Sequence, residues 1–351
     1  MRTDHGLQVV RLGLLGAGRI GSMHAGNVAR RVPGAELVAV ADPRVEAARE
    51  LADKYGARAC GVDELLADPE IDAVLITSIA AVQSELIVRA AEAGKAVWSE
   101  KPASLTVEEI DQAIAATKAA GVPFQVGFNR RFAADFAAAR ATIDAGGIGT
   151  PQLMRSITRD PGWPAGLSNA GGVRPWTIFR ETLIHDFDTL LWLNPGAEVV
   201  EVYTRGDALV APQFKADGLI DTAVVVLTFD NGAIATAEAN FSALYGYDVR
   251  GEVFGSKGMV VAGRLPSTTA VQYDASGLHQ QTMRSDEQMF GDAYVQELVD
   301  FTEVVRGNAE PPVTGEDARR ALTIALAAMR SYEQHSPIQI TRNDRLTKED
   351  I

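Results

Sequence analysis

A glutamate and a histidine four residues apart are the residues of this sequence best suited to acid–base chemistry. They are Glu181 and His185, in the stretch FRETLIHDFDTLLWL at residues 179–193. On a helical wheel at about 100° per residue, both lie opposite the apolar face. That face holds Leu183, Ile184, Phe187, Leu190 and Leu191. The pattern therefore removes His185 from the helical core face and leaves it as a general base, a metal ligand or part of a solvated surface.

The residues around His185 favour two of these roles over the third. As a general base, His185 would take the proton of a substrate hydroxyl while a hydride leaves, and Glu181 would orient the ring and support its positive charge. Metal binding would pair His185 with Glu181 or Asp188. No second histidine stands at ligand spacing, and the chain has only 5 histidines. We therefore predict no metal site, and the choice between a general base and a solvated face stays open on these residues alone.

A second group of residues suits dinucleotide binding. The glycine pattern GAGRIG follows a strand pattern and runs directly into a helical one. Gly16 permits the tight turn, Gly18 lets a pyrophosphate approach the backbone, and Gly21 allows close packing of helix on strand. Arg19 and Ile20 belong to the same turn. The pattern predicts a cofactor site formed by this loop and the positive end of the helix.

Asp42 indicates which dinucleotide the loop binds. It stands 21 residues after Gly21, at the end of the second predicted strand. A carboxylate there accepts hydrogen bonds from both adenosine ribose hydroxyls and repels a 2′-phosphate, which favours NAD over NADP. Arg44 leaves NADP possible, because a nearby arginine can bind that phosphate. The alternative is a glycine turn in an α/β domain that binds no dinucleotide.

Polar residues also end two further predicted strands. Thr77 and Ser78 end one strand, and Glu100, Lys101 and Pro102 follow the end of another. In a doubly wound sheet, ligands bind at the carboxyl ends of the strands, so these residues are expected near the nicotinamide half. Lys101 can hydrogen-bond a substrate hydroxyl and lower its pKa, and Pro102 is a candidate for a cis peptide bond. The alternative for Lys101 is a surface lysine at a strand end.

The elements that must position these residues form two sequence patterns. In the first pattern, typical of an α/β Rossmann domain, β-branched runs alternate with amphipathic helices such as 44–55 and 106–120. The runs are 8–16, 35–42, 72–78, 95–100 and 123–128. The second pattern has longer strands at 151–159, 197–205, 219–229, 233–244, 247–255 and 258–262, with helices at 287–306 and 315–335. It predicts an α+β domain with a mainly antiparallel sheet, in which Asn231-Gly232 forms a hairpin turn with φ > 0 at both residues. We place the domains at 1–126 and 127–351.

Length, composition and charge are consistent with a two-domain protein that does not bind nucleic acid. The chain has 351 residues, more than one hydrophobic core usually serves. Its formal net charge of -13 argues against nucleic-acid binding, which needs clustered Lys and Arg. Cys60 is the only cysteine, so no internal disulfide or multi-cysteine zinc site is possible. No run of about 18 apolar residues suggests a membrane span, and we expect a cytoplasmic protein without a membrane partner.

Several of these motifs together resemble the Gfo/Idh/MocA family of oxidoreductases over nearly the whole chain. They are GAGRIG, AVAD, EKP, VGFNRRF and TLIHDFDTLLWL. Within the family, ALYGYDVRGEVFGSKGMV at 243–260 is most similar to inositol 2-dehydrogenases. The resemblance implies a Rossmann domain followed by an open-faced sheet, which often forms tetramers, although a homodimer is also consistent. It implies NAD-dependent oxidation of a secondary alcohol on a cyclic polyol such as myo-inositol or scyllo-inositol.

Two alternative functions are also consistent with these residues. A sugar dehydrogenase acting on a pyranose or an anhydrosugar would use the same chemistry. A non-catalytic NAD-binding regulator would keep the glycine loop and Asp42, but it would not need Lys101 together with His185.

The resemblance also implies roles for individual residues. Lys101 matches the active-site lysine of the family, and His185 matches its acid/base histidine. Substrate or nicotinamide contacts are implied for Asn129, Arg130 and Asp160, with Thr182 beside the catalytic pair. Tyr245 and Tyr247 match an aromatic pair that closes the polyol pocket; the alternative is that they are ordinary strand tyrosines.

The chain departs from the pattern of the inositol dehydrogenases at two positions. Glu181 stands where these enzymes usually have aspartate, and its extra methylene changes both the hydrogen bond to His185 and the room for a substrate hydroxyl. Gln83 stands where relatives often have histidine. The change at Glu181 puts the substrate in doubt, and the change at Gln83 is expected to alter the wall on the nicotinamide side. The Gly/Pro-rich loop 161–175 is expected to line the pocket, with Trp163 and Trp176 as candidates to stack on a sugar ring.

Overall fold

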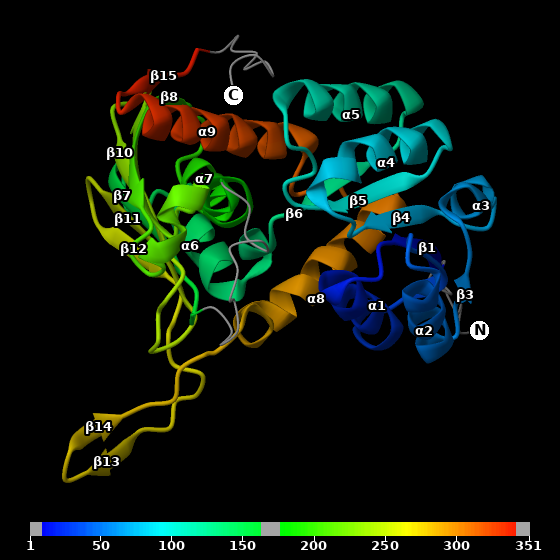
Figure 1. Ribbon diagram of the computed structural model, residues 1–351, viewed down its shortest axis with the longest axis horizontal. Coiled ribbons are helices and arrows are strands. Elements are labelled where there is room, and N and C mark those ends of the chain that lie inside the picture. The colour runs from blue at the N-terminus through cyan, green and yellow to red at the C-terminus, as the bar shows by residue number, and fades with distance from the viewer. Residues whose placement is uncertain (1–8, 163–175, 342–351) are drawn as a thin grey trace. The chain divides into compact units, whose positions relative to one another are not determined.

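The computed structural model describes residues 9–162 and 176–341, which divide into two units (Figure 1). The first unit comprises Met1–Phe132 and Asp292–Arg319, and the second comprises Ala133–Gly291 and Arg320–Ile351. The sequence pattern placed the boundary after residue 126 and assigned every later residue to the second domain. The segment from Asp292 joins the first unit because Leu298, Phe301 and Val304 are buried in its hydrophobic core. Within the described ranges, no helix combines the length and the apolar character that spanning a bilayer requires.

The first unit contains a six-stranded sheet in the order β3-β2-β1-β4-β5-β6. All of its strand pairs are parallel, which confirms the Rossmann prediction. The strands are β1 (Val10–Leu15), β2 (Ala35–Ala41), β3 (Arg58–Ala59), β4 (Ala73–Ile76), β5 (Ala96–Glu100) and β6 (Phe124–Gly127). The helices between them are α1 (Arg19–Arg31), α2 (Val45–Tyr55), α3 (Val62–Ala67), α4 (Ala80–Glu92) and α5 (Val107–Ala120), and the 3-10 turn η1 (Asn129–Phe132) follows β6. Helix α8 (Asp286–Val305) adds the core residues named above.

Local sequence signals explain where helix α5 begins and ends. Thr106 precedes the helix, and its hydroxyl accepts a hydrogen bond from the backbone N–H of Glu109. Glu108 and Glu109 in the first turn complement the positive end of the helix. Gly121 ends the helix in the left-handed conformation, with φ 66°. The helix therefore covers nearly the span that its apolar spacing predicts.

The second unit contains a seven-stranded sheet in the order β12-β11-β7-β10-β9-β8-β15. Its strands are β7 (Pro151–Arg159), β8 (Val199–Asp207), β9 (Thr222–Phe229), β10 (Ile234–Asn240), β11 (Asp248–Gly255), β12 (Met259–Ala262) and β15 (Ile338–Gln339). The pair β10 and β7 is parallel, with Ala237 opposite Ser156, and the other pairs are antiparallel. The sheet is therefore mixed. The two successive antiparallel pairings, β8 with β9 and β9 with β10, make β10 run in the same direction as β8, and β10 also pairs in parallel with β7.

Helices cover one face of this sheet. They are α6 (Ala134–Asp144), α7 (Leu183–Trp192) and the part of α9 (Gly315–Gln334) that belongs to this unit. Helix α7 packs on β7 and β10. The short strands β13 (Gln272–Asp274) and β14 (Gly277–His279) form a separate ribbon that projects away from the sheet (Figure 1). The opposite face of the large sheet carries exposed apolar side chains, among them Leu153, Ile234, Phe254 and Met259.

The hairpin between β9 and β10 has the predicted position but not the predicted turn. Gly232 has φ 86°, whereas Asn231 does not have positive φ. The N–H of Gly232 donates to the carbonyl of Phe229, and the N–H of Phe229 donates to the carbonyl of Ala233. This pattern indicates a three-residue loop with glycine in the left-handed position. The prediction of φ > 0 at both central residues was wrong, because Asp230 adds a residue to the loop.

Candidate active site

The glycine loop between β1 and α1 has the shape that a dinucleotide requires. Gly16 has φ 117°, and a Cβ atom there would lie 2.8 Å from the backbone carbon of Thr77. A Cβ atom on Gly21 would lie 1.9 Å from the carbonyl oxygen of Gly16, whereas one on Gly18 would meet no atom within 4 Å. The backbone around Gly18 is therefore open to a ligand, while the other two glycines permit close packing. Arg19 and Ile20 begin helix α1 directly after it.

The start of helix α1 is suited to an anion. Gly18 precedes the helix without a side-chain cap, and the first turn contains no acidic residue. The backbone N–H groups and the positive end of the helix dipole are thus left to interact with a negatively charged group. The pyrophosphate of a dinucleotide fits this position.

Asp42 lies beside the loop at the end of β2 and is held in place from both sides. Its Oδ2 accepts a hydrogen bond of 2.7 Å from the N–H of Ala17, and its Oδ1 accepts one of 2.8 Å from the N–H of Arg44. Burial opposes ionisation, but these N–H groups and then the Arg44 guanidinium hold the pKa of Asp42 below its usual value of 3.8. The Arg44 Nε lies 3.3 Å from Oδ1. Asp42 is therefore a fixed carboxylate that already engages the nearby arginine.

Thr77 and Ser78 lie at the carboxyl end of β4, and their hydroxyls bond to the backbone of the glycine loop. The Thr77 hydroxyl donates to the carbonyl of Gly16 at 2.8 Å, and the Ser78 hydroxyl donates to the carbonyl of Leu15 at 2.9 Å. These bonds tie the end of β4 to the end of β1. The two residues therefore help to shape the cofactor loop.

Lys101 follows β5 at the same edge of the sheet. The Lys101–Pro102 peptide bond is cis, which confirms the prediction for Pro102. The N–H of Ala103, which has φ 67°, donates to Oε1 of Gln83 at 2.9 Å. Gln83 is 2% exposed, and its Nε2 donates to the carbonyl of Ser78 at 3.0 Å. Gln83 thus joins the turn after Lys101 to the end of β4.

Asn129 and Arg130 complete this edge. They begin the η1 turn after β6, and both are buried. The adjacent Arg131 pairs with Asp317 at 3.0 Å, which fixes the turn to the start of α9. The predicted residues of the first unit therefore gather at the carboxyl ends of neighbouring strands of one parallel sheet, as the sequence pattern predicts.

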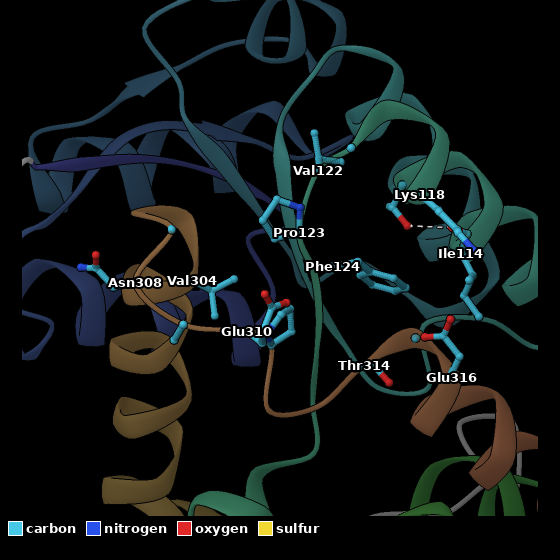
Figure 2. Close-up of a pocket in the computed structure, with 16 residues that line it drawn as sticks. Ile114, Lys118, Val122, Pro123, Phe124, Val304, Asn308, Glu310, Thr314 and Glu316 are labelled. Carbon is cyan, nitrogen blue, oxygen red and sulfur yellow. Dashed lines mark hydrogen bonds between the residues drawn. The ribbon is translucent and has the colours of Figure 1, made fainter.

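A large groove in the first unit lies at the opposite end of the strands of this sheet, where β6 begins. It has a volume of about 800 Å³ and lies between the end of α5, the start of β6 and the segment from Val304 to Glu316. Figure 2 shows Val122, Pro123 and Phe124 along its wall. These residues precede or begin β6, whereas Lys101 follows the carboxyl end of β5. The groove is therefore separate from the candidate cofactor site.

In the second unit, His185 lies on helix α7, but the helix does not begin as predicted. Residues Ile178–Thr182 form a π-helical turn, and regular α-helix begins at Leu183. The N–H of Leu183 donates to the carbonyl of Ile178, five residues back. The prediction of one continuous α-helix over 179–193 was wrong, so that Glu181 and His185 are not related by a regular α-helical turn. Glu181 is exposed, and Thr182 and His185 are half-buried.

The apolar face of α7 is buried as predicted. Its residues Leu183, Ile184, Phe187, Leu190 and Leu191 are all 3% exposed or less. Asp186, which the sequence pattern did not single out, is fully buried beside His185. Asp186 accepts a hydrogen bond of 2.5 Å from the Ser156 hydroxyl and one of 2.7 Å from the Thr158 hydroxyl. Because both donors lie on β7, Asp186 anchors the helix that carries His185 to the sheet.

The remaining predicted residues of the second unit lie in three places. Asp160 follows β7, and its N–H donates to the carbonyl of Asn240. Tyr245 is exposed, and its hydroxyl donates to Asp248 at 2.8 Å and lies 3.4 Å from Arg159. Trp176 is half-buried against Phe179 and Tyr332. Trp163 lies outside the described residues. The predicted catalytic residues Lys101 and His185 belong to different units.

Comparison with known proteins identifies the relatives of the whole chain. Residues 10–128 match the Gfo/Idh/MocA oxidoreductase family with an NAD-binding Rossmann fold, and residues 143–340 match its C-terminal alpha/beta domain. The myo-inositol 2-dehydrogenase of Thermotoga maritima is 38% identical over 94% of this chain and 98% of its own length. The scyllo-inositol 2-dehydrogenase (NAD(+)) of Bacillus subtilis is 38% identical over 94% of this chain and 96% of its own length.

A solved structure with bound ligands is also similar. The scyllo-inositol dehydrogenase of Lactobacillus casei, with bound NAD(H) and scyllo-inositol, superposes with a TM-score of 0.88 at 28% identity. The alignment covers 95% of this chain and 99% of that one. The likeness therefore extends through both units.

Proposed function

Because the chain belongs to the Gfo/Idh/MocA oxidoreductase family, we propose that it is an NAD-dependent dehydrogenase of a cyclic polyol. The substrate is myo-inositol or scyllo-inositol, and the product is the corresponding ketone. The observation that carries this proposal is the edge of the first sheet, where the glycine loop, Asp42 and Lys101 follow neighbouring strands. Relatives named as inositol dehydrogenases and aligned over nearly their whole length support the choice of substrate class.

The residues of the first unit have complementary roles toward the cofactor. The loop from Gly16 to Gly21 and the start of α1 would hold the pyrophosphate, and the Asp42 carboxylate would accept hydrogen bonds from the ribose hydroxyls. When bound, NAD supplies the hydride acceptor. Asp42 disfavours the additional phosphate of NADP, because Arg44 already pairs with the same carboxylate. Thr77, Ser78 and Glu100 support the cofactor edge.

The chemistry of the alcohol falls to Lys101 and His185. The Lys101 ammonium donates a hydrogen bond to the substrate oxygen and stabilises the developing alkoxide. His185 accepts the hydroxyl proton as the C=O bond forms and the C–H hydrogen leaves as hydride, and it returns the proton in the reverse direction. Glu181 orients His185 and supports its positive charge. Contacts to the other hydroxyls are proposed for Asn129, Arg130, Asp160, Trp163, Trp176, Thr182 and Tyr245.

Glu181 favours a second candidate substrate. Its side chain is one methylene longer than the aspartate usual in inositol dehydrogenases, and it is the exposed residue of the π-helical turn. A longer carboxylate changes which hydroxyl pattern fits beside His185. A pyranose or an anhydrosugar is therefore the alternative substrate for the same reaction.

We further propose that the open face of the second sheet binds a second copy of the chain, in a homotetramer or a homodimer. One row across four strands is apolar and exposed, since Ile234 lies opposite Leu153, Leu153 opposite Phe254, and Phe254 opposite Met259. An exposed apolar row on a sheet is a typical association surface. Light scattering after gel filtration tests this, and a Phe254→Lys variant should lower the molar mass.

An activity panel tests the reaction. Purified protein is mixed with NAD or NADP and with individual inositols and pyranoses, and NADH or NADPH absorbance is followed. A rise with an inositol and NAD is expected. A rise with a pyranose alone would favour the second candidate, and no rise with any polyol or sugar would refute both.

A pair of histidine variants tests the proton transfer. His185→Ala should lower turnover by about two orders of magnitude while NAD binding is retained. His279→Ala is the matched control, because His279 is an exposed histidine on the projecting ribbon. An unchanged rate in His185→Ala would remove that histidine from the mechanism.

A further inference from the structure

Three titratable side chains form a buried cluster inside the first unit, and one of them, Glu100, directly precedes Lys101. They are His24 on α1, Glu100 at the end of β5 and Glu297 on α8, and their side chains are 0%, 10% and 0% exposed. Nε2 of His24 lies 3.2 Å from Oε1 of Glu100 and 3.9 Å from Oε1 of Glu297. His24 and Glu297 could not be singled out from sequence, because they are far apart in the chain and neither lies at ligand spacing from another candidate.

Glu100 connects this cluster to Lys101. Its Oε1 faces His24, and its Oε2 accepts a hydrogen bond of 3.1 Å from the backbone N–H of Lys101. Nδ1 of His24 is buried and has no hydrogen-bond partner among the residues that the structure describes. A proton on Nε2 satisfies this arrangement, because a proton on Nδ1 would have no acceptor. His24 therefore donates to Glu100.

Glu297 completes the cluster on the side of helix α8. Both of its carboxylate oxygens are buried and have no hydrogen-bond partner within the described ranges. Burial, and then the charge of Glu100, raise the pKa of Glu297 well above its ordinary value of 4.5. Tyr294, on the same helix, is the other titratable side chain seen against His24, with its ring edge-on to the imidazole. The carboxyl group of Glu100 is thus held between the His24 ring and the Lys101 N–H.

We propose that His24 and Glu297 are positioning residues for Lys101. His24 holds one oxygen of Glu100, and this fixes the other oxygen against the Lys101 backbone. Glu297 closes the cluster on the side of α8, with its Oε1 3.9 Å from Nε2 of His24. This role rests on the proposed function insofar as Lys101 is taken as the residue that contacts substrate.

A bound metal ion is the competing explanation for a histidine and two glutamates. The ligand atoms of His24, Glu100 and Glu297 all lie within 4.8 Å of one another. However, the Lys101 N–H already engages one oxygen of Glu100, and the raised pKa of Glu297 disfavours the ionised form that a cation would bind. Groups of the chain therefore already contact both oxygens of Glu100.

Three variants separate positioning from simple destabilisation. His24→Leu removes the donor to Glu100, and His24→Gln restores an N–H donor at a similar reach. Val304→Ala is the matched control, because Val304 lies on α8 in the same core and is 3% exposed. It lowers stability without contacting the cluster.

The first measurement is hydrogen exchange in the apo protein, read by mass spectrometry on peptides that contain Lys101. His24→Leu should speed exchange of that amide by about tenfold or more. His24→Gln and Val304→Ala should stay near wild type. The second measurement is turnover with the polyol that wild type oxidises. We expect kcat to fall by about tenfold or more in His24→Leu, with NADH affinity within about twofold and recovery in His24→Gln.

The outcomes distinguish this proposal from the proposed function. Faster exchange in a protein whose wild type oxidises no polyol would support the positioning of Lys101 while refuting the polyol reaction. Unchanged exchange in His24→Leu would overturn the positioning role, whatever happens to turnover. One equivalent of metal in purified wild type that is lost in His24→Leu would also overturn it, and would assign the cluster to a cation.

Discussion

Replacement of Thr158 by valine should loosen the attachment of helix α7 to its sheet. The Thr158 hydroxyl donates to Oδ2 of Asp186 at 2.7 Å, and the Ser156 hydroxyl donates to Oδ1 at 2.5 Å. All three residues are 3% exposed or less, so water does not replace a lost donor. A hydrogen bond to a charged group contributes about 1.5–3 kcal/mol, and valine fills nearly the same volume as threonine. We therefore expect Thr158→Val to lower the free energy of unfolding by about 1.5–3 kcal/mol.

Thermal unfolding measures this loss. For a unit of this size, about 2–4 °C per kcal/mol converts the expected change into a Tm lower by about 3–12 °C. Tryptophan fluorescence reports on the correct region, because Trp192 lies on α7 itself. Thr236→Val is the matched control, since Thr236 is half-buried on the neighbouring strand β10, and its effect should stay within about 0.5 kcal/mol.

The same variant tests whether the anchor matters to His185, which directly precedes Asp186. Loss of the anchor should reduce kcat for the polyol more than it changes the KM for NAD. Adding Ser156→Ala should cost more than the sum of the two single changes, because the carboxylate then loses both hydroxyl donors. A Thr158→Val protein as stable as Thr236→Val would refute the proposed contribution of this hydrogen bond.

Three further predictions concern single carboxylates. Asp42→Ala should raise the KM for NAD by about tenfold, because the ribose hydroxyls lose their acceptor. It should also lower the ratio of kcat/KM for NAD to kcat/KM for NADP, because Arg44 is released from the carboxylate. An unchanged ratio would contradict this prediction. Glu181→Asp should change the relative kcat/KM of inositols and pyranoses by about fivefold or more, and an identical substrate profile would exclude Glu181 as a determinant of specificity. Glu297→Gln should make the protein more stable than wild type at neutral pH. Because burial and Glu100 raise the pKa of Glu297 in the folded state, the stability it contributes is complete below its ordinary value of 4.5 and is lost as the pH rises toward the folded pKa. Urea unfolding between pH 5 and 8 should therefore show a smaller loss of stability with rising pH in Glu297→Gln than in wild type. If stability depends on pH equally in the two proteins, the pKa of Glu297 is not raised.

The cofactor edge was predictable from sequence because each part of it is encoded locally. Short β-branched runs define the strands, and the ends of parallel strands meet at one edge. Gly16 and Asp42 could therefore be assigned without knowledge of distant contacts. The cis bond at Pro102 could be anticipated for the same reason, since it belongs to a tight turn that directly follows a strand.

The buried cluster could not be predicted in the same way. Helix α8 was expected at nearly its observed span, but nothing in its apolar spacing indicates which strand end Glu297 faces. That contact depends on how residues from Asp292 join the first unit, after more than a hundred intervening residues of the second. A glutamate within an amphipathic helix is ordinarily a solvated residue. Only the tertiary arrangement shows that Glu297 is fully buried beside Glu100.

In the stretch around His185, the buried apolar face was predicted correctly, but the continuous α-helix was not. The apolar residues from Leu183 onward follow α-helical periodicity, so their burial was predictable. The π-helical turn at Ile178–Thr182 adds a residue to the turn just before them, and no residue type in FRET signals it. Glu181 is therefore displaced around the axis relative to the position that i, i+4 spacing predicts. Its side chain is also longer than the usual aspartate, and both differences alter where the carboxylate lies relative to His185. The Glu181→Asp variant shortens the side chain but keeps the π-helical turn. Its substrate selectivity therefore shows how the length of the side chain acts in the setting of that turn.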